Sequence, residues 1–331
     1  MPEVLLNVDS VTKIYRLGGL FTGTTFKAVS EVSFSLIKTR PEVFTIIGES
    51  GSGKTTLSLM ILRRQLPDSG AIHLNGTDIA SLRGRRQELD YMRLIQPIFQ
   101  NPFESFNPLN KIDHYLFATA QNFFQDNDDR VETALKSVGL SLKEVRGRYP
   151  HELSGGQLQR IAIARAIIPQ PTILVADEPV SMVDASLRMS IVNLFKDLKE
   201  HLGTSIIYIT HDLATAYYIS DRLAIMHRGV FVEQGEAQEI LLRPHHPYTR
   251  LLVDSVLDPK PGKAGFAHQP AGLEKDEYVV QGCKFAPRCP LVRDRCRVET
   301  PEPTGDETHL VRCFAAADEA RTHQASQSSR N

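Results

Sequence analysis

Residues 48–56 of the chain read GESGSGKTT and match the pattern G-x-x-x-x-G-K-[ST]. Residues 43–47, VFTII, form a short apolar run before them, which is typical of a buried parallel strand. Residues 55–64, TTLSLMILRR, are competent to form a helix. This strand, loop and helix order predicts a loop that binds the phosphates of ATP or GTP.

The residue types in the loop suit this chemistry. Glycines at positions 48, 51 and 53 let successive N–H groups turn toward phosphate oxygens, and the helix N-terminus adds its positive end. We expect Lys54 to reach the β- and γ-phosphates and the Thr55 hydroxyl to bind Mg²⁺. A glycine-rich turn that binds nothing is the structural alternative. The expected nucleotide contacts are Gly48, Glu49, Ser50, Gly51, Ser52, Gly53, Lys54, Thr55 and Thr56.

The whole chain has an ordinary composition. Of its 331 residues 41% are hydrophobic and 23% are charged, and the net charge of −1 gives no global positive field that would attract nucleic acid. No apolar run approaches the roughly 18 residues of a membrane-spanning helix. The first residues, MPEVLLNVDS, lack a basic region of the kind that opens a secretory signal. We therefore expect a cytoplasmic protein that reaches a membrane only through a partner.

Three regions of the chain differ in their residue pattern and composition. Residues 1–245 alternate short apolar runs (43–47, 173–176 and 205–209) with helical patterns, which predicts an α/β domain with a parallel sheet. One helix is expected over residues 158–168, before Pro169. Residues 246–314 form a cysteine-bearing extension that includes a linker at 259–262, and residues 315–331 form a polar tail expected to be disordered. Without an internal repeat, the chain holds one nucleotide-binding domain.

The string LSGGQ at residues 153–157 narrows the class of protein, because it resembles the signature of the ABC ATPase family. The resemblance implies a RecA-like parallel core, an antiparallel β subdomain and a helical subdomain at about residues 100–160. It also implies that the signature contacts the γ-phosphate of ATP held by an opposite subunit, so that the active unit is a dimer. The residues concerned are Ser154, Gly155, Gly156 and Gln157.

Further motifs follow in the order of that family. Asp177 and Glu178 end the run ILVADE, and the resemblance implies that Asp177 holds Mg²⁺ while Glu178 acts as general base. A solvated turn is the alternative for two adjacent carboxylates. Gln100 resembles the glutamine that senses Mg²⁺ and the attacking water, and His211 resembles the histidine that contacts the γ-phosphate. For stacking on adenine we expect Tyr15, with Phe21 or Phe26 as alternatives.

The last third of the chain resembles one subfamily. Residues 246–252, HPYTRLL, and 282–290, GCKFAPRCP, look like segments of ATPases from oligopeptide and dipeptide importers. The insertion at residues 17–27 resembles the longer of two paired ATPases. This implies a second ATPase subunit, two integral membrane permeases and, indirectly, an extracytoplasmic solute-binding protein. The chain would lie peripherally at the cytoplasmic face of the inner membrane. A homodimer stays open, and His245 and His246 are expected to start a helix rather than bind metal.

Four aromatic or cyclic side chains cluster just after Gln100, in the region that docks on membrane subunits in this family. An apolar patch of this kind marks a partner surface when it is exposed, and packs the helical region when it is buried. The sequence does not decide between these. The basic run at residues 83–86 is expected to be a solvated face, with contact to lipid head groups as the alternative. The four residues are Phe99, Phe103, Phe106 and Pro108.

All four cysteines lie in the extension. Four thiolates suffice for one zinc ion or one [4Fe–4S] cluster, and the paired C-x₂₋₄-C spacing of structural zinc sites is absent. Resemblance to importer subunits that carry an iron–sulfur centre favours the cluster, with zinc second and unliganded thiols as the alternative. The cysteines are Cys283, Cys289, Cys296 and Cys313.

The expected function is ATP hydrolysis that energises import of oligopeptides or dipeptides. The same machinery importing a nickel complex, glutathione or an oligosaccharide is the alternative. A soluble ABC ATPase acting on ribosomes or DNA is disfavoured, because such proteins usually carry two ATP domains or a long coiled coil. An exporter is disfavoured because exporters often fuse the ATPase to membrane helices. A silent binding module is disfavoured because Glu178 and His211 are present.

Overall fold

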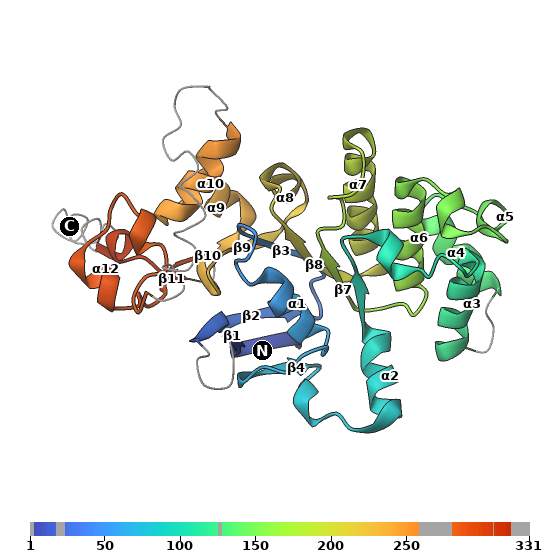
Figure 1. Cartoon of the computed structure of the whole chain (residues 1–331), viewed down its shortest axis with the longest axis horizontal. Helices are drawn as coiled ribbons and strands as arrows, with labels where there is room; N and C mark the ends of the chain where they lie inside the picture. Colours follow the sequence, from blue (N-terminus) through green and yellow to red (C-terminus); the bar gives the residue numbers. More distant parts are fainter. Residues whose placement is uncertain (1–2, 18–23, 125–127, 258–279, 307, 319–331) are drawn as a thin grey trace.

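The computed structural model describes residues 3–17, 24–124, 128–257, 280–306 and 308–318. Two β-sheets meet at the centre of the molecule, a helical region lies at one end and the cysteine-bearing extension at the other (Figure 1). The expected linker at residues 259–262 and the alternative stacking residue Phe21 lie outside the described residues.

Among the described residues, the larger sheet has eight strands in the order β11-β12-β10-β9-β3-β8-β7-β6. Strands β6, β7, β8, β3 and β9 run parallel, and every residue of β3 and β8 is buried, which confirms the expected buried parallel strands. The strands are β3 (Val43–Ile47), β6 (Ile95–Ile98), β7 (Ile173–Asp177), β8 (Ser205–Thr210), β9 (Arg222–His227), β10 (Val230–Glu236), β11 (Thr304–Asp306) and β12 (His309–Val311).

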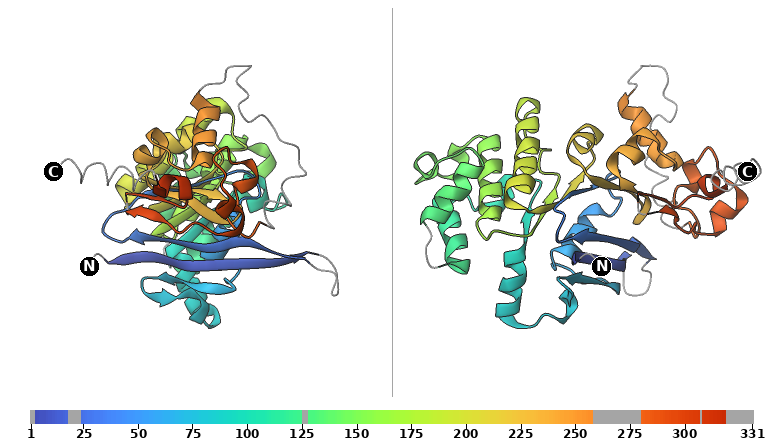
Figure 2. Two further views of the ribbon diagram at one scale, coloured as in Figure 1. Left: turned by 90° about the vertical axis from the view of Figure 1, so that its left-hand side faces the viewer. Right: turned by 180° about the vertical axis from the view of Figure 1, so that it is seen from behind.

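The smaller sheet is antiparallel, with the order β2-β1-β4-β5. Its strands are β1 (Val4–Leu17), β2 (Thr24–Ile37), β4 (Ser69–Leu74) and β5 (Thr77–Asp78), and Figure 2 shows β1 and β2 as two long ribbons side by side. Phe34 of β2 stacks on Phe44 of β3 with ring centroids 4.5 Å apart, so the two sheets share one apolar core. That core also contains Leu57 and Met60, which brings the helix after the phosphate loop into the same cluster.

The helices cover the sheets and build the helical region. They are α1 (Lys54–Ile61), α2 (Gly84–Leu94), α3 (Ile112–Phe123), α4 (Asp128–Ser137), α5 (Leu142–Val145), α6 (Gly155–Ile167), α7 (Ala185–Leu202), α8 (Leu213–Ile219), α9 (Ala237–Leu242), α10 (Pro247–Leu257) and α12 (Asp294–Val298). Short 3₁₀ turns lie at Ile79–Ser81, Pro102–Ser105, Pro150–Glu152 and Ala286–Arg288.

The helical region packs as one core with the nearby strands. Buried side chains of α3, α4 and α6 form a single cluster with residues of β7, β8 and α7. Phe106 belongs to this cluster and is 3% exposed, whereas Phe99 and Phe103 are exposed. Helix α6 begins three residues before the predicted start at residue 158, because Ser154 caps it at Gly155.

The extension continues the larger sheet. Strand β12 pairs with β10, and β11 pairs with β12, so these two strands extend the edge of the nucleotide-binding domain. Residues 314–318 are helical, and Ala315 and Ala316 are buried. The prediction that the disordered tail starts at residue 315 is therefore wrong for 315–318, since those alanines pack on the extension. None of the described helices combines the length and the apolar character that crossing a membrane requires.

Candidate active site

The phosphate loop joins β3 to α1, as the sequence predicts. Gly53 has φ of 104°, and a Cβ at this position would lie 2.2 Å from the Ala28 carbonyl oxygen. A Cβ on Gly48 would lie 2.2 Å from the Met226 carbonyl oxygen. The loop therefore fits between β2 and β9 only because these two positions lack side chains.

Lys54 lies inside the loop with 6% of its surface exposed. Its Nζ donates to the carbonyl oxygens of Gly48 at 2.7 Å and Glu49 at 2.9 Å. Burial lowers the pKa of Lys54, while the nearby carboxylates of Glu178 and Asp177 act in the opposite direction. The ammonium group is thus held over the turn where phosphate oxygens are expected.

Thr55 and Asp177 meet beside this group. The pKa of Asp177 is raised mainly by burial, and hydrogen bonds from the side chains of Thr55 and Ser58 act against that shift. Ser58 Oγ lies 3.4 Å from Asp177 Oδ2. A hydroxyl and a carboxylate side by side form the type of oxygen donor set that Mg²⁺ uses. Sequence reasoning missed Ser58, although its position one turn after Thr55 places it on the same helix face.

The Glu178 carboxylate contacts two other predicted site residues. Gln100 Nε2 donates to Glu178 Oε2 at 3.2 Å, and His211 Nδ1 lies 3.0 Å from Glu178 Oε1. These three side chains follow β6, β7 and β8, whose parallel directions bring their carboxyl ends to one edge. Glu178 has φ of 46°, a left-handed conformation that costs a residue of this type about 1–3 kcal/mol. The strained backbone aims its carboxylate at the site, where its N–H is fixed to the Ile209 carbonyl oxygen.

The residues of the LSGGQ string lie at the start of α6, apart from the phosphate loop. Ser154 caps α6 by a reciprocal pair of bonds, since its Oγ accepts from Gln157 N at 3.2 Å and its N–H donates to Gln157 Oε1 at 3.0 Å. In the view of Figure 1, α6 and α1 lie on opposite sides of β7. A Cβ on Gly156 would lie 2.8 Å from Leu187 Cδ1, so the helix start packs tightly on α7.

Tyr15 lies on β1 opposite Phe26 of β2. Its hydroxyl donates to Gln65 Oε1 at 2.5 Å, and its ring centroid lies 5.8 Å from that of Phe26. Both rings are half-buried. Ala28 follows Phe26 by two residues in β2, and its carbonyl lies against Gly53, so the strand that carries Phe26 borders the loop. Tyr15 stays the predicted adenine-stacking residue.

The four cysteines line one small cavity, together with His246, Pro247 and Ala315 among others. All four are free thiols. Burial raises the pKa of Cys283 to about 12 and also raises those of Cys289 and Cys313. Over the described ranges, the one group of three His, Cys, Asp or Glu ligand atoms within 4.8 Å of one another is Glu233, His245 and His309. Three cysteine sulfurs are therefore not that close together.

The buried carboxylate of Glu233 anchors the extension. It accepts hydrogen bonds from the N–H groups of His245 at 2.8 Å and His246 at 3.0 Å, and lies 2.5 Å from His309 Nε2. His246 Nδ1 accepts from Tyr248 N at 3.1 Å, which is the geometry of a helix cap and agrees with the prediction of a helix start for His246, whereas His245 precedes this cap and its N–H bonds to Glu233. Strand β10, helix α10 and strand β12 are thereby tied at one carboxylate.

Comparison with known proteins gives two family matches. The family described as ABC transporter matches residues 29–181, and the family described as oligopeptide/dipeptide transporter, C-terminal region, matches residues 232–296. The di/tripeptide transport ATP-binding protein DppF of Pseudomonas aeruginosa is 37% identical over 95% of this chain and 98% of its own length. The oligopeptide transport ATP-binding protein AppF of Bacillus subtilis is 37% identical over 94% of this chain and 97% of its own length.

Solved structures with the same fold are also found. A dimeric ATP-binding cassette bound to ADP and phosphate matches with a TM-score of 0.61 and 25% identity, covering 70% of this chain and 98% of that one. A protein of Clostridium perfringens that is part of the ABC transporter complex cbiONQ matches with a TM-score of 0.62 and 26% identity, covering 77% of this chain and 96% of that one.

Proposed function

The chain belongs to the family of ATP-binding subunits of ABC transporters, and we propose that it hydrolyses ATP to drive the import of peptides. The observation that carries the proposal is the meeting of Gln100, Glu178 and His211 beside the loop that holds Lys54. The peptide cargo is supported by the match of residues 232–296 and by the peptide-transport names of the relatives. A nickel complex, glutathione or an oligosaccharide is the alternative cargo.

The residues suggest how the reaction proceeds. Loop N–H groups and the Lys54 ammonium bind the phosphates, and Thr55 and Asp177 would hold Mg²⁺, which neutralises phosphate charge when bound. Glu178 accepts a proton from water while the water oxygen attacks the γ-phosphorus. The bond from that phosphorus to the β–γ bridging oxygen breaks, releasing ADP and phosphate. Gln100 and His211 orient the Glu178 carboxylate through one oxygen each.

The position of Ser154 supports a dimer as the active unit. The start of α6 offers the Ser154 hydroxyl and the glycine N–H groups at a helix N-terminus, a good anion site. Ser154 is exposed, so a second subunit can bring its bound nucleotide to it. The similar cassette bound to ADP and phosphate is dimeric. We propose a heterodimer with a second ATPase, and a homodimer is the alternative.

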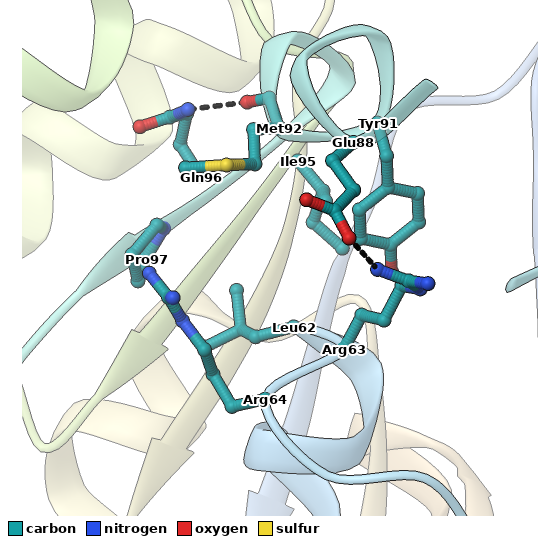
Figure 3. Close-up of a pocket in the computed structure, with 9 residues that line it drawn as sticks. All are labelled: Leu62, Arg63, Arg64, Glu88, Tyr91, Met92, Ile95, Gln96 and Pro97. Atoms are coloured by element: carbon teal, nitrogen blue, oxygen red, sulfur yellow. Dashed lines mark hydrogen bonds and ion pairs between the residues drawn. The ribbon is translucent and has the colours of Figure 1, made fainter. Parts of the chain in front are cut away.

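A surface next to Gln100 suits the membrane subunits. Two cavities of about 170 and 140 Å³ share Arg64, Met92, Gln96 and Pro97. Figure 3 shows the first, with Arg63 bonded to Glu88 and Gln96 bonded to the Met92 carbonyl. Met92 and Phe99 line these cavities and are exposed, and Phe103, in the turn Pro102–Ser105, is exposed as well, whereas Phe106 is buried. A permease helix docked here would lie beside Gln100 and would hold the chain at the inner face of the membrane, with the solute-binding protein acting from outside.

We propose that the cysteine cavity holds a [4Fe–4S] cluster, with zinc as the alternative. Four thiolates around zinc at about 2.3 Å lie about 3.8 Å from one another, well inside 4.8 Å. No three of the cysteine sulfurs are that close, although all four cysteines line one cavity. A cluster places each thiolate on a different iron atom and so needs sulfurs that are further apart. When bound it would crosslink the extension, and the four thiols would be deprotonated as ligands.

Metal analysis tests this assignment. Protein purified without oxygen is expected to contain about four iron and four sulfide per chain. Replacing Cys296→Ser is expected to remove most of the iron, while the control Ser137→Ala, at an exposed serine of α4, leaves it unchanged. About one zinc per chain without iron, or no metal in either anaerobic or aerobic preparations, would contradict the iron–sulfur proposal.

Uptake measurements test the cargo. A strain that lacks this chain is expected to lose uptake of a labelled tripeptide, and the wild-type gene should restore that uptake. A gene with Glu178→Gln should not restore it, because ATP turnover drives transport. The same strains are supplied with nickel, glutathione and a labelled oligosaccharide. Unchanged peptide uptake combined with loss of one of these other solutes would replace the peptide assignment.

A further inference from the structure

The extension touches the phosphate loop at Glu49. Arg288 Nη1 donates to Glu49 Oε1 at 3.1 Å, and Arg288 Nη2 donates to Glu49 Oε2 at 2.9 Å. This is a two-pronged pair between a planar guanidinium and a carboxylate, the geometry that gives an ion pair its strongest directionality. Both side chains are partly buried, with 21% of Arg288 and 33% of Glu49 exposed, so solvent weakens the pair without abolishing it.

A second residue from outside the loop holds the backbone of Glu49. The N–H of Glu49 donates to Tyr248 Oη at 3.1 Å, and the Glu49 carbonyl oxygen accepts from Lys54 Nζ. Tyr248 lies in α10 and is completely buried. Glu49 is thus fixed at its N–H, its carbonyl and its carboxylate, and two of these three contacts come from the C-terminal part of the chain.

Arg288 and Tyr248 are themselves held firmly. Arg288 ends the short 3₁₀ turn Ala286–Arg288, which lies between Cys283 and Cys289. Phe285, at the start of this turn, is buried. Its ring centroid lies 5.4 Å from that of Tyr248 and 5.5 Å from that of His227. The main chain of Cys283 is bonded to that of Cys296. The turn and helix α10 therefore form one packed unit behind the loop.

We propose that Arg288 and Tyr248 are positioning residues for ATP turnover, and that the cysteine-bearing turn braces the phosphate loop through Glu49. The inference rests on the proposed function, since it concerns ATP bound at this loop. Loop N–H groups bind phosphate best when they already point inward, because ordering them during binding costs free energy. The brace supplies this order from the C-terminal part of the chain. The brace stabilises bound ATP and the transition state equally. Its loss should therefore raise KM and leave kcat almost unchanged.

Kinetics of three single variants and one double variant test the brace. Arg288→Gln and Glu49→Gln are each expected to raise the KM for ATP about 5- to 10-fold, the size of effect that loss of a charged hydrogen-bonded pair produces, with kcat within about twofold. Tyr248→Phe keeps the buried ring and removes only the hydroxyl, and a rise of about 2- to 5-fold is expected. The double variant Glu49→Gln with Arg288→Gln is expected to match the single variants, because both remove one interaction. The dissociation constant for ATP, measured by calorimetry, should rise in parallel.

A matched control separates the brace from general damage to the extension. Arg293→Ala breaks an ion pair with Asp318 in the same extension, which does not involve the loop, so KM should stay at the wild-type value. Thermal unfolding of every variant shows whether the fold is intact. The proposed brace is wrong if the wild type turns over ATP while Arg288→Gln and Tyr248→Phe keep the wild-type KM. It is also wrong if the effects of Glu49→Gln and Arg288→Gln on KM add in the double variant. If wild type neither binds nor hydrolyses ATP, the proposed function itself fails.

Discussion

Replacing Glu178 by glutamine is expected to lower kcat for ATP hydrolysis about 100- to 10,000-fold, the range by which a positioned general base accelerates a reaction. Glutamine has nearly the same shape and can still meet Gln100 and His211, which lie 3.2 and 3.0 Å from the two carboxylate oxygens. What it loses is the capacity to accept a proton from water. ATP affinity should change by less than about threefold, because the loop and Lys54 are untouched.

Phosphate release and ATP binding are measured on the same preparation to check this result. Glu239→Gln is a suitable control, because Glu239 pairs with Arg243 on an exposed face of α9 and has no part in the site. It should hydrolyse ATP at the wild-type rate. A Glu178→Gln protein with wild-type kcat would show that another group accepts the proton, whereas a parallel loss of ATP binding would assign Glu178 to binding instead.

The centre of this site could be predicted because its parts are local or related by simple sheet geometry. The loop pattern lies between an apolar run and a helix, and the structure places β3 and α1 at those positions. Gln100, Glu178 and His211 each follow a strand, and adjacent parallel strands bring their carboxyl ends together. The sequence predicts a turn of the backbone at Gly53, and the φ of 104° at this residue agrees.

The remaining features depend on contacts between segments far apart in the chain. Glu49 and Arg288 are 239 residues apart, and nothing in either local sequence indicates the partner. Phe106 was grouped with Phe99 and Phe103 because they are neighbours in the sequence, yet only packing against the helical core decides that Phe106 is buried. Residues 315–318 open the polar terminal segment 315–331, but Ala315 and Ala316 are buried against the extension. Burial of this kind is a property of the assembled surface.

The phosphate loop is consequently supported on several sides. Backbone of β2 and β9 lies against Gly53 and Gly48, and the carboxylates of Asp177 and Glu178 act electrostatically on Lys54. The extension reaches Glu49. A loop held in this way needs little rearrangement when phosphate binds, which favours affinity. At its centre stands a single ammonium group, so its removal should have a large effect.

Replacing Lys54 by alanine is expected to reduce kcat/KM for ATP at least about 100-fold, because the charge-assisted contacts to the β- and γ-phosphates are lost in a buried site where they are strong. Lys54 is 6% exposed, and Nζ also bridges the carbonyl oxygens of Gly48 and Glu49. Alanine therefore removes both a ligand for phosphate and a tie within the loop. ATP hydrolysis and ATP binding are measured together on the purified variant.

Two further variants separate these roles of Lys54. Lys54→Met fills the same space without a charge, so it should be as inactive as Lys54→Ala if the ammonium binds phosphate. Substantial activity in Lys54→Met would instead indicate that the side chain mainly fills the loop. Lys38→Ala removes an exposed lysine that pairs with Glu3 and should hydrolyse ATP normally. Undiminished ATP hydrolysis in Lys54→Ala would contradict the assignment of residues 48–56 as the phosphate-binding loop, since the lysine is the only cation of that segment.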